Sequence, residues 1–186
     1  MDDALAKRGR SLEEAFFIDR DNKLIAERKR LEEMQKTKEV LTQVSGIRDS
    51  KLLDQLIALN MSPASLASLM IFPLVAVAWA DGQLSDVEKT AVLEAAASQG
   101  IKPQTPNYAI LEAWLSKPPA PSLLDVWIDY IRAIRGVMQP QEFSALQTEL
   151  LQRAQKVAGA SGGVLGIGKV STEEKAVLNK MQDAFK

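Results

Sequence analysis

Residues 66–80 contain no charged side chain, and this stretch constrains the fold more than any other part of the chain. A segment so nearly apolar must be buried on almost every side. It is shorter than the roughly 20 apolar residues that cross a bilayer, and Asp81 follows it directly. We therefore expect a helix at the centre of a helical bundle, opened by Ser62 and Pro63 and kinked or ended part-way by Pro73.

Signals for helix starts recur along the rest of the chain, with apolar residues at helical spacing between them. Stretches typical of β-strands are short. The sequence therefore predicts an all-α fold. Beyond the central helix, the expected helices cover residues 50–59, 86–99, 106–116 and 123–137, a segment opened by Gln139 and Pro140, and about 172–185.

The first 46 residues predict one long charged helix. Ser11 and Glu14 form a capping box at its expected start, and no helix breaker follows until Gly46. Ten acidic and ten basic residues stand among the first 45, which favours a solvated surface rather than a core. We expect the chain to divide into a helical arm, 1–46, and a helical bundle, 47–186.

Apolar residues of the arm follow a broken heptad pattern. Phe17, Leu24 and Leu31 keep the seven-residue spacing, which Arg20 and Glu27 interrupt. Two interpretations remain open. The helix packs along its own domain with one side in solvent, or it binds a partner protein or a second copy through its apolar stripe.

The composition excludes several classes of site. The chain has no cysteine and no histidine, which removes disulfides, thiolate nucleophiles, imidazole bases and the usual zinc ligands. Lys and Arg total 23 against 24 for Asp and Glu, so no net field attracts nucleic acid or an anionic membrane. No nucleophile stands in a recognisable catalytic context, so we expect no enzyme. The first residues lack the apolar run of a secretory signal, so we expect a cytoplasmic protein.

A seven-residue pattern occurs twice, 86 residues apart, at 82–88 and 168–174. Each copy begins with a glycine and continues with the signature of a capped helix start. The predicted capping boxes pair Ser85 with Glu88 and Ser171 with Glu174.

Asp81 precedes only the first copy and places an acid at that turn. With Gly82 and Glu88 it matches the second half of an EF-hand calcium loop. The first half is missing, because Val77 and Trp79 stand where two ligands are needed. We therefore weigh a simple capped turn against a weaker divalent-cation site, held by Asp81 and Glu88 with carboxylates from elsewhere in the fold.

The glycine-rich segment 163–169 matches the spacing of a phosphate-binding loop as far as Lys169. Val170 then replaces the serine or threonine that holds magnesium, and the preceding element is expected to be a helix rather than a buried strand. We expect a hinge at this segment rather than a nucleotide site.

The stretch from Pro73 to Leu93, in which an apolar helix ends in Ala-Asp-Gly and Glu88 follows in the next helix, resembles the TerB-like family. Residues 168–178 look like a degenerate second copy, with Ile167 in the place of the acid. The resemblance covers roughly residues 50–186. It implies an all-helical bundle, an association with tellurite resistance and other stress-response modules, and a metal-binding role for the acids at the turn, which here are Asp81 and Glu88.

The arm has a resemblance of its own. Residues 12–16, together with Asp19, Lys23 and Arg30, are similar to the leading helix of the zeta-type inhibitor subunit of bacterial ATP synthase. This implies an alternative function, an ATPase inhibitor or complex subunit that acts through its N-terminal helix. Our first expectation is a non-catalytic binding or scaffold protein that holds a protein partner with this helix, without nucleic acid or a membrane span, and with a divalent cation as the one possible cofactor.

Overall fold

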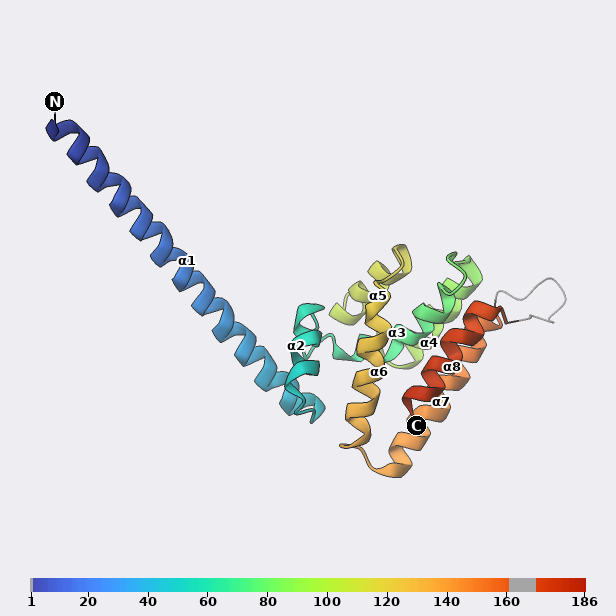
Figure 1. Cartoon of the computed structure of the whole chain (residues 1–186). Helices are drawn as coiled ribbons and strands as arrows, with labels where there is room; N and C mark the ends of the chain where they lie inside the picture. Colours follow the sequence, from blue (N-terminus) through green and yellow to red (C-terminus); the bar gives the residue numbers. More distant parts are fainter. Residues whose placement is uncertain (1, 161–169) are drawn as a thin grey trace. The chain divides into compact units, whose positions relative to one another are not determined.

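The computed structural model describes the backbone of residues 2–160 and 170–186, and their side chains except those of residues 2–19 and 21. Every element of secondary structure in these ranges is an α-helix, so the all-α prediction is confirmed (Figure 1). The helices are α1 Asp2–Ser45, α2 Ser50–Ala58, α3 Leu66–Ala78, α4 Asp86–Ser98, α5 Pro106–Ser116, α6 Ser122–Arg135, α7 Pro140–Ala158 and α8 Thr172–Ala184. Within the described ranges, each helix is too short or too polar to span a bilayer.

The chain falls into two compact units, residues 1–40 and 41–186. The first unit is made of the greater part of α1. The last turn of α1 belongs to the second unit, because Leu41 is fully buried there. Ile47, just beyond the helix, is buried in the same hydrophobic core.

The start of α1 differs from the prediction. The helix begins at Asp2, whereas the capping box of Ser11 and Glu14 predicted a start near residue 11. Residues 2–10 contain no proline and are rich in Ala, Lys and Arg, which are strong helix formers. A capping sequence favours a helix start but does not enforce one, and each residue added to an existing helix gains a hydrogen bond.

The end of α1 is where the sequence predicts it, at Ser45 beside Gly46. Gly46 has a φ of +73°, and a Cβ atom built on it would lie 2.5 Å from Cγ1 of Val137. Its N–H donates to the carbonyl of Thr42 at 2.9 Å, while the Ser45 hydroxyl donates to the carbonyl of Leu41 at 2.7 Å. Glycine suits both this left-handed backbone and the space beside Val137.

Helix α3 is the centre of the second unit, as the uncharged stretch predicts. It packs against α4, α5, α6, α7 and α8. Its side chains are buried around the whole circumference of the helix rather than along one stripe. Those that are buried are Leu66, Ser68, Leu69, Ile71, Phe72, Pro73, Leu74, Val75, Val77 and Ala78.

The start of α3 corrects the prediction, and the helix around Pro73 excludes one of the two outcomes expected there. The helix starts at Leu66 rather than at Ser62 and Pro63, because Ser62 and Ser65 form a turn of their own in which the Ser62 N–H donates to Ser65 Oγ at 2.8 Å. The helix continues through Pro73, so of the two outcomes expected at this proline, a kink or a helix end, the helix end is wrong. A proline inside a helix costs about 3 kcal/mol. Packing on all sides of α3 outweighs that cost, since Pro73 is itself buried.

The expected ranges match to within two residues at either end for α2, α4, α5, α6 and α8, and α7 starts where Gln139 and Pro140 predict it. Helix α6 presents an apolar face that includes Trp127 and Ile131, both fully buried. Phe185, just after α8, packs edge-on against Trp127 with ring centroids 6.1 Å apart and against Phe143 at 5.3 Å. The last residues of the chain therefore contribute to the core.

We expect Leu74→Ala to lower the free energy of unfolding by about 2–5 kcal/mol, because it removes a fully buried side chain from α3 and leaves a cavity. Leu31→Ala is the matched control, since that leucine is exposed on α1 and should change stability by less than about 0.5 kcal/mol. Urea denaturation followed by circular dichroism measures both values. Equal midpoints for the two variants would contradict a core centred on α3.

Candidate functional site

The corner between α3 and α4 holds the acid that the sequence singled out. Asp81 is exposed, and its Oδ1 accepts a hydrogen bond from the N–H of Gln83 at 2.9 Å. Gly82 between them has a φ of +85°. Aspartate and glycine thus shape a tight turn, in which one carboxylate oxygen of Asp81 is occupied and the side chain faces solvent.

Glu88 belongs to the capping box of α4. Its Oε2 accepts from the N–H of Ser85 at 2.8 Å and from the Ser85 hydroxyl at 2.7 Å. In return, the Ser85 Oγ accepts from the N–H of Glu88 at 3.2 Å. The residue is buried, so the predicted capping box is confirmed and one oxygen of this carboxylate is engaged by the first turn of its own helix.

The second copy of the repeat forms the same cap at α8. Oε2 of Glu174 accepts from the N–H of Ser171 at 2.6 Å, and Ser171 Oγ accepts from the N–H of Glu174 at 3.0 Å. Glu174 is buried as well, and its Oε1 has no hydrogen-bond partner in the part of the chain that the structure describes. Ile167 and Gly168, the start of this copy, and the glycine-rich segment 163–169 lie outside the described residues.

The two predicted metal ligands therefore have different surroundings. Asp81 is exposed on the turn, whereas Glu88 is buried in a cap. Among the side chains that the structure describes, those of residues 20, 22–160 and 170–186, no group of three or more carboxylates gathers in a way that would hold a metal ion. A divalent cation at Asp81 and Glu88 stays a prediction.

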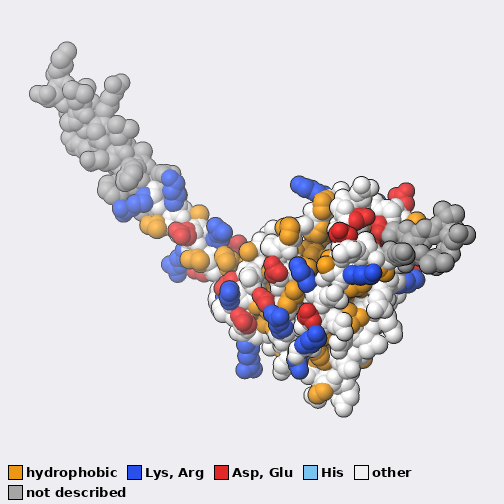
Figure 2. Space-filling model, turned by 45° about the vertical axis from the view of Figure 1, so that its right-hand side comes forward, with side chains coloured by type: hydrophobic (Ala, Val, Ile, Leu, Met, Phe, Trp, Pro, Cys, Tyr) orange, Lys and Arg blue, Asp and Glu red, His pale blue; other side chains and the backbone are white. Residues whose placement is uncertain are grey.

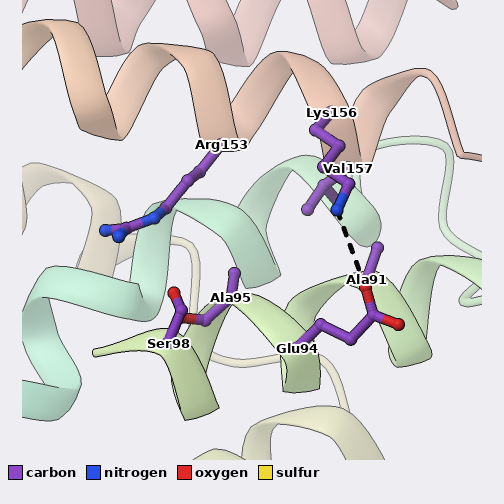
Figure 3. Close-up of a pocket in the computed structure, with 7 residues that line it drawn as sticks. All are labelled: Ala91, Glu94, Ala95, Ser98, Arg153, Lys156 and Val157. Atoms are coloured by element: carbon purple, nitrogen blue, oxygen red, sulfur yellow. Dashed lines mark hydrogen bonds and ion pairs between the residues drawn. The ribbon is translucent and has the colours of Figure 1, made fainter. Parts of the chain in front are cut away.

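A cavity of about 140 Å³ lies between α4 and α7 (Figure 3). Ala91 and Ala95 of α4 and Val157 of α7 give it an apolar lining. At one end Lys156 of α7 reaches across to Glu94 of α4, with 3.6 Å between Nζ and Oε2. Both of these side chains are mostly exposed, at 74 % and 63 %.

Arg153 lies at the other end of this cavity, on the side of Ser98 (Figure 3). Its side chain is only 20 % exposed, and its Nη2 is 2.5 Å from Oε1 of Glu149, four residues earlier in α7. The other terminal nitrogen, Nη1, is buried and has no hydrogen-bond partner among the described residues. Sequence reasoning missed this residue, because the spacing of Glu149 and Arg153 indicates only a surface ion pair on one helix.

Two shallow apolar pockets flank Pro119 and Ala120 in the connector before α6. One is lined by Trp114 and the other by Trp79, and the indole N–H of Trp79 donates to the carbonyl of Trp114 at 2.9 Å. Both tryptophans are half-buried against the core, whereas Trp127 is fully buried.

The first unit carries exposed apolar side chains. Leu24, Ile25 and Leu31 are 56 %, 54 % and 59 % exposed. Figure 2 shows hydrophobic side chains between basic and acidic ones along the described part of this unit. Arg28 stands between the two leucines and pairs with Glu32, with 3.0 Å between Nε and Oε1.

Comparison of the chain with protein-family models, with curated proteins and with solved structures finds no match. The resemblance to the TerB-like family therefore rests on the motif around Asp81 and stays a prediction.

We expect Ser85→Ala and Ser171→Ala each to destabilise the second unit by about 0.5–2 kcal/mol, because each removes the side chain that caps a helix. Ser98→Ala provides the control, since this exposed serine stands at the end of α4 and caps no helix start. Thermal unfolding by calorimetry measures the three values. If both cap variants unfold at the same temperature as the Ser98 variant, the capping boxes contribute nothing to stability.

Proposed function

We propose that this chain is a non-catalytic protein-binding module and that residues 1–40 hold its partner. The observation that carries the proposal is the exposure of Leu24, Ile25 and Leu31 in a unit made of helix alone. A single helix has no core in which to bury such side chains. Exposed apolar residues that recur on one helix mark a surface for another protein.

The position of the leucines supports helix-in-groove binding. Leu24 and Leu31 are seven residues apart, which places them on one face of α1. Burying one such side chain contributes about 1.5–3 kcal/mol, so the two together supply a useful part of a specific affinity. The charged residues around them keep the free helix soluble and would form the polar rim of the interface.

The resemblance to the TerB-like family supports a scaffold of the stress-response type, with the second unit as its structural platform. In this proposal a divalent cation at Asp81 and Glu88 would link the turn after α3 to the start of α4 and bias the angle between these helices. The alternative is an ATPase-inhibitor-like or complex-subunit protein. It uses the same N-terminal helix and differs from the scaffold in the identity of the partner.

We expect the double variant Leu24→Gln, Leu31→Gln to lose its partner, with recovery lowered by about tenfold or more, because it removes the apolar side chains from the binding face. The double variant Asn22→Gln, Lys29→Gln is the control, since these exposed residues are also seven apart and lie on the opposite face of α1. Quantitative mass spectrometry of native-lysate proteins retained by each immobilised full chain gives the measurement. Circular dichroism confirms that both variants keep the helix.

A partner retained equally by the leucine variant and by the wild type would overturn the proposal that this helix binds it. If the retained protein is an ATPase, inhibition of its hydrolysis by the full chain decides in favour of the alternative function. A retained protein of another class favours the scaffold.

The cation prediction has a separate test. We expect calorimetric titration with Ca²⁺, Mg²⁺, Mn²⁺ or Zn²⁺ to give a binding heat that Asp81→Ala abolishes, because this substitution removes the exposed ligand and leaves the Glu88 cap in place. Equal heats for the wild type and the variant would reject Asp81 as a cation ligand.

A further inference from the structure

We propose that the partner of α1 is itself a helix, with acidic side chains on both sides of its own apolar stripe. This inference rests on the proposed function and adds the chemistry of the partner. The observation behind it is the distribution of charge around α1. Between residues 22 and 40, basic residues border the stripe of Leu24 and Leu31, whereas most of the acidic residues lie elsewhere on the helix.

The residues that flank the stripe are basic or uncharged. A heptad with Leu24 and Leu31 at position a defines the flanking positions e and g. Between residues 22 and 37 these positions hold Lys23, Arg28, Arg30, Gln35 and Thr37. Side chains at e and g reach across a helix pair to the same positions of the partner, so the partner that fits carries Glu or Asp there.

Two of these basic residues are open to a partner. Arg28 is 83 % exposed, and its pair with Glu32 uses Nε, at 3.0 Å, which leaves its terminal nitrogens to a carboxylate from outside. Arg30 is exposed and has no ion-pair partner among the described side chains. Lys23 already interacts within its own chain, so Arg28 and Arg30 carry the recognition.

The acidic residues of the same part of α1 stand mostly away from the stripe. Of the four between residues 22 and 40, Glu32, Glu33 and Glu39 are at positions b and c of the heptad. Glu27 is the exception, at position d between the two leucines. A partner meets it with a polar residue in its own stripe, and one such polar layer fixes the register of a helix pair.

Two other occupants of this face fit less well. A second copy of α1, packed in parallel, would place Lys23 of one chain against Arg28 of the other and Glu27 against Glu27, and both contacts are repulsive. Helices that lie on an anionic membrane are rich in Lys and Arg on their polar face, whereas Glu32 and Glu33 occupy part of that face here. An acidic helix is the occupant that the charges favour.

The test is the binding of the full chain to two designed helical peptides, measured by fluorescence anisotropy. Both are about three heptads long, with Leu at a and d except for one Gln to face Glu27. One peptide carries Glu at every e and g position and the other carries Lys. We expect the Glu peptide to bind about tenfold more tightly or better, because it alone forms ion pairs with Arg28 and Arg30, and to bind more weakly as salt is added.

Charge reversal at the two arginines is the decisive variant. We expect Arg28→Glu, Arg30→Glu to prefer the Lys peptide by about tenfold or more. The control is Lys29→Glu, Lys36→Glu, which makes the same change in net charge at exposed residues on the opposite face of α1 and should keep the preference of the wild type. Circular dichroism shows that both variants keep the helix.

The proposal is overturned if the wild type binds neither peptide up to about 1 mM, or if it binds both equally well. It is overturned as well if the control variant loses the preference, since the net charge and not the flanking arginines would then decide. A full chain that pairs with itself in sedimentation, or that binds vesicles of phosphatidylcholine and phosphatidylserine, while the Glu peptide does not bind, also overturns it.

Leu24→Gln, Leu31→Gln separates this inference from the proposed function. If this variant binds the Glu peptide as the wild type does, the apolar binding face itself is contradicted. If it binds neither peptide, while the wild type binds both equally, the binding face stands and only the acidic partner is rejected.

Discussion

The burial of α3 on all sides is the constraint on which the second unit depends. A helix with no polar face has to be covered on nearly every side, and five other helices pack around it. The same requirement explains why the helix continues through Pro73. The hydrogen bond lost at the proline is a local cost, whereas ending the helix there would disturb the packing on every side. The fold is thus organised by one segment of thirteen residues.

Local features of this fold could be predicted from the sequence, and features that arise between helices could not. The uncharged stretch and the capping boxes at Ser85 and Ser171 depend on residues next to one another in the chain, and each is present in the structure. The start of α1 was missed because helix propensity before Ser11 outweighed a nearby cap. The pocket between α4 and α7 could not be foreseen, because its lining residues come from two helices that are far apart in the sequence and meet only in the folded chain.

The two capping boxes show how a repeated sequence pattern need not mean a repeated function. Glu88 and Glu174 are both buried, and the carboxylate of each accepts a hydrogen bond from the backbone N–H of the serine that caps its helix. In α4 the serine hydroxyl also donates to the carboxylate, whereas in α8 one oxygen of Glu174 has no donor within residues 2–160 and 170–186. The shared residues are explained by helix capping. A function specific to one corner would have to depend on residues that differ between the two copies. Asp81, which precedes only the first copy, is such a residue.

Because Leu41 is buried in the second unit, the boundary between the two units lies before Leu41 and not at the end of α1. A polypeptide that began at Ile47, after the helix ends, would lack this side chain and leave a leucine-sized void among the residues that it contacts. A protease that cut the exposed helix before Leu41 would instead release the N-terminal segment and leave that interior filled. Limited proteolysis can therefore remove the exposed part of α1 and leave the second unit intact only if the cleaved bond precedes Leu41.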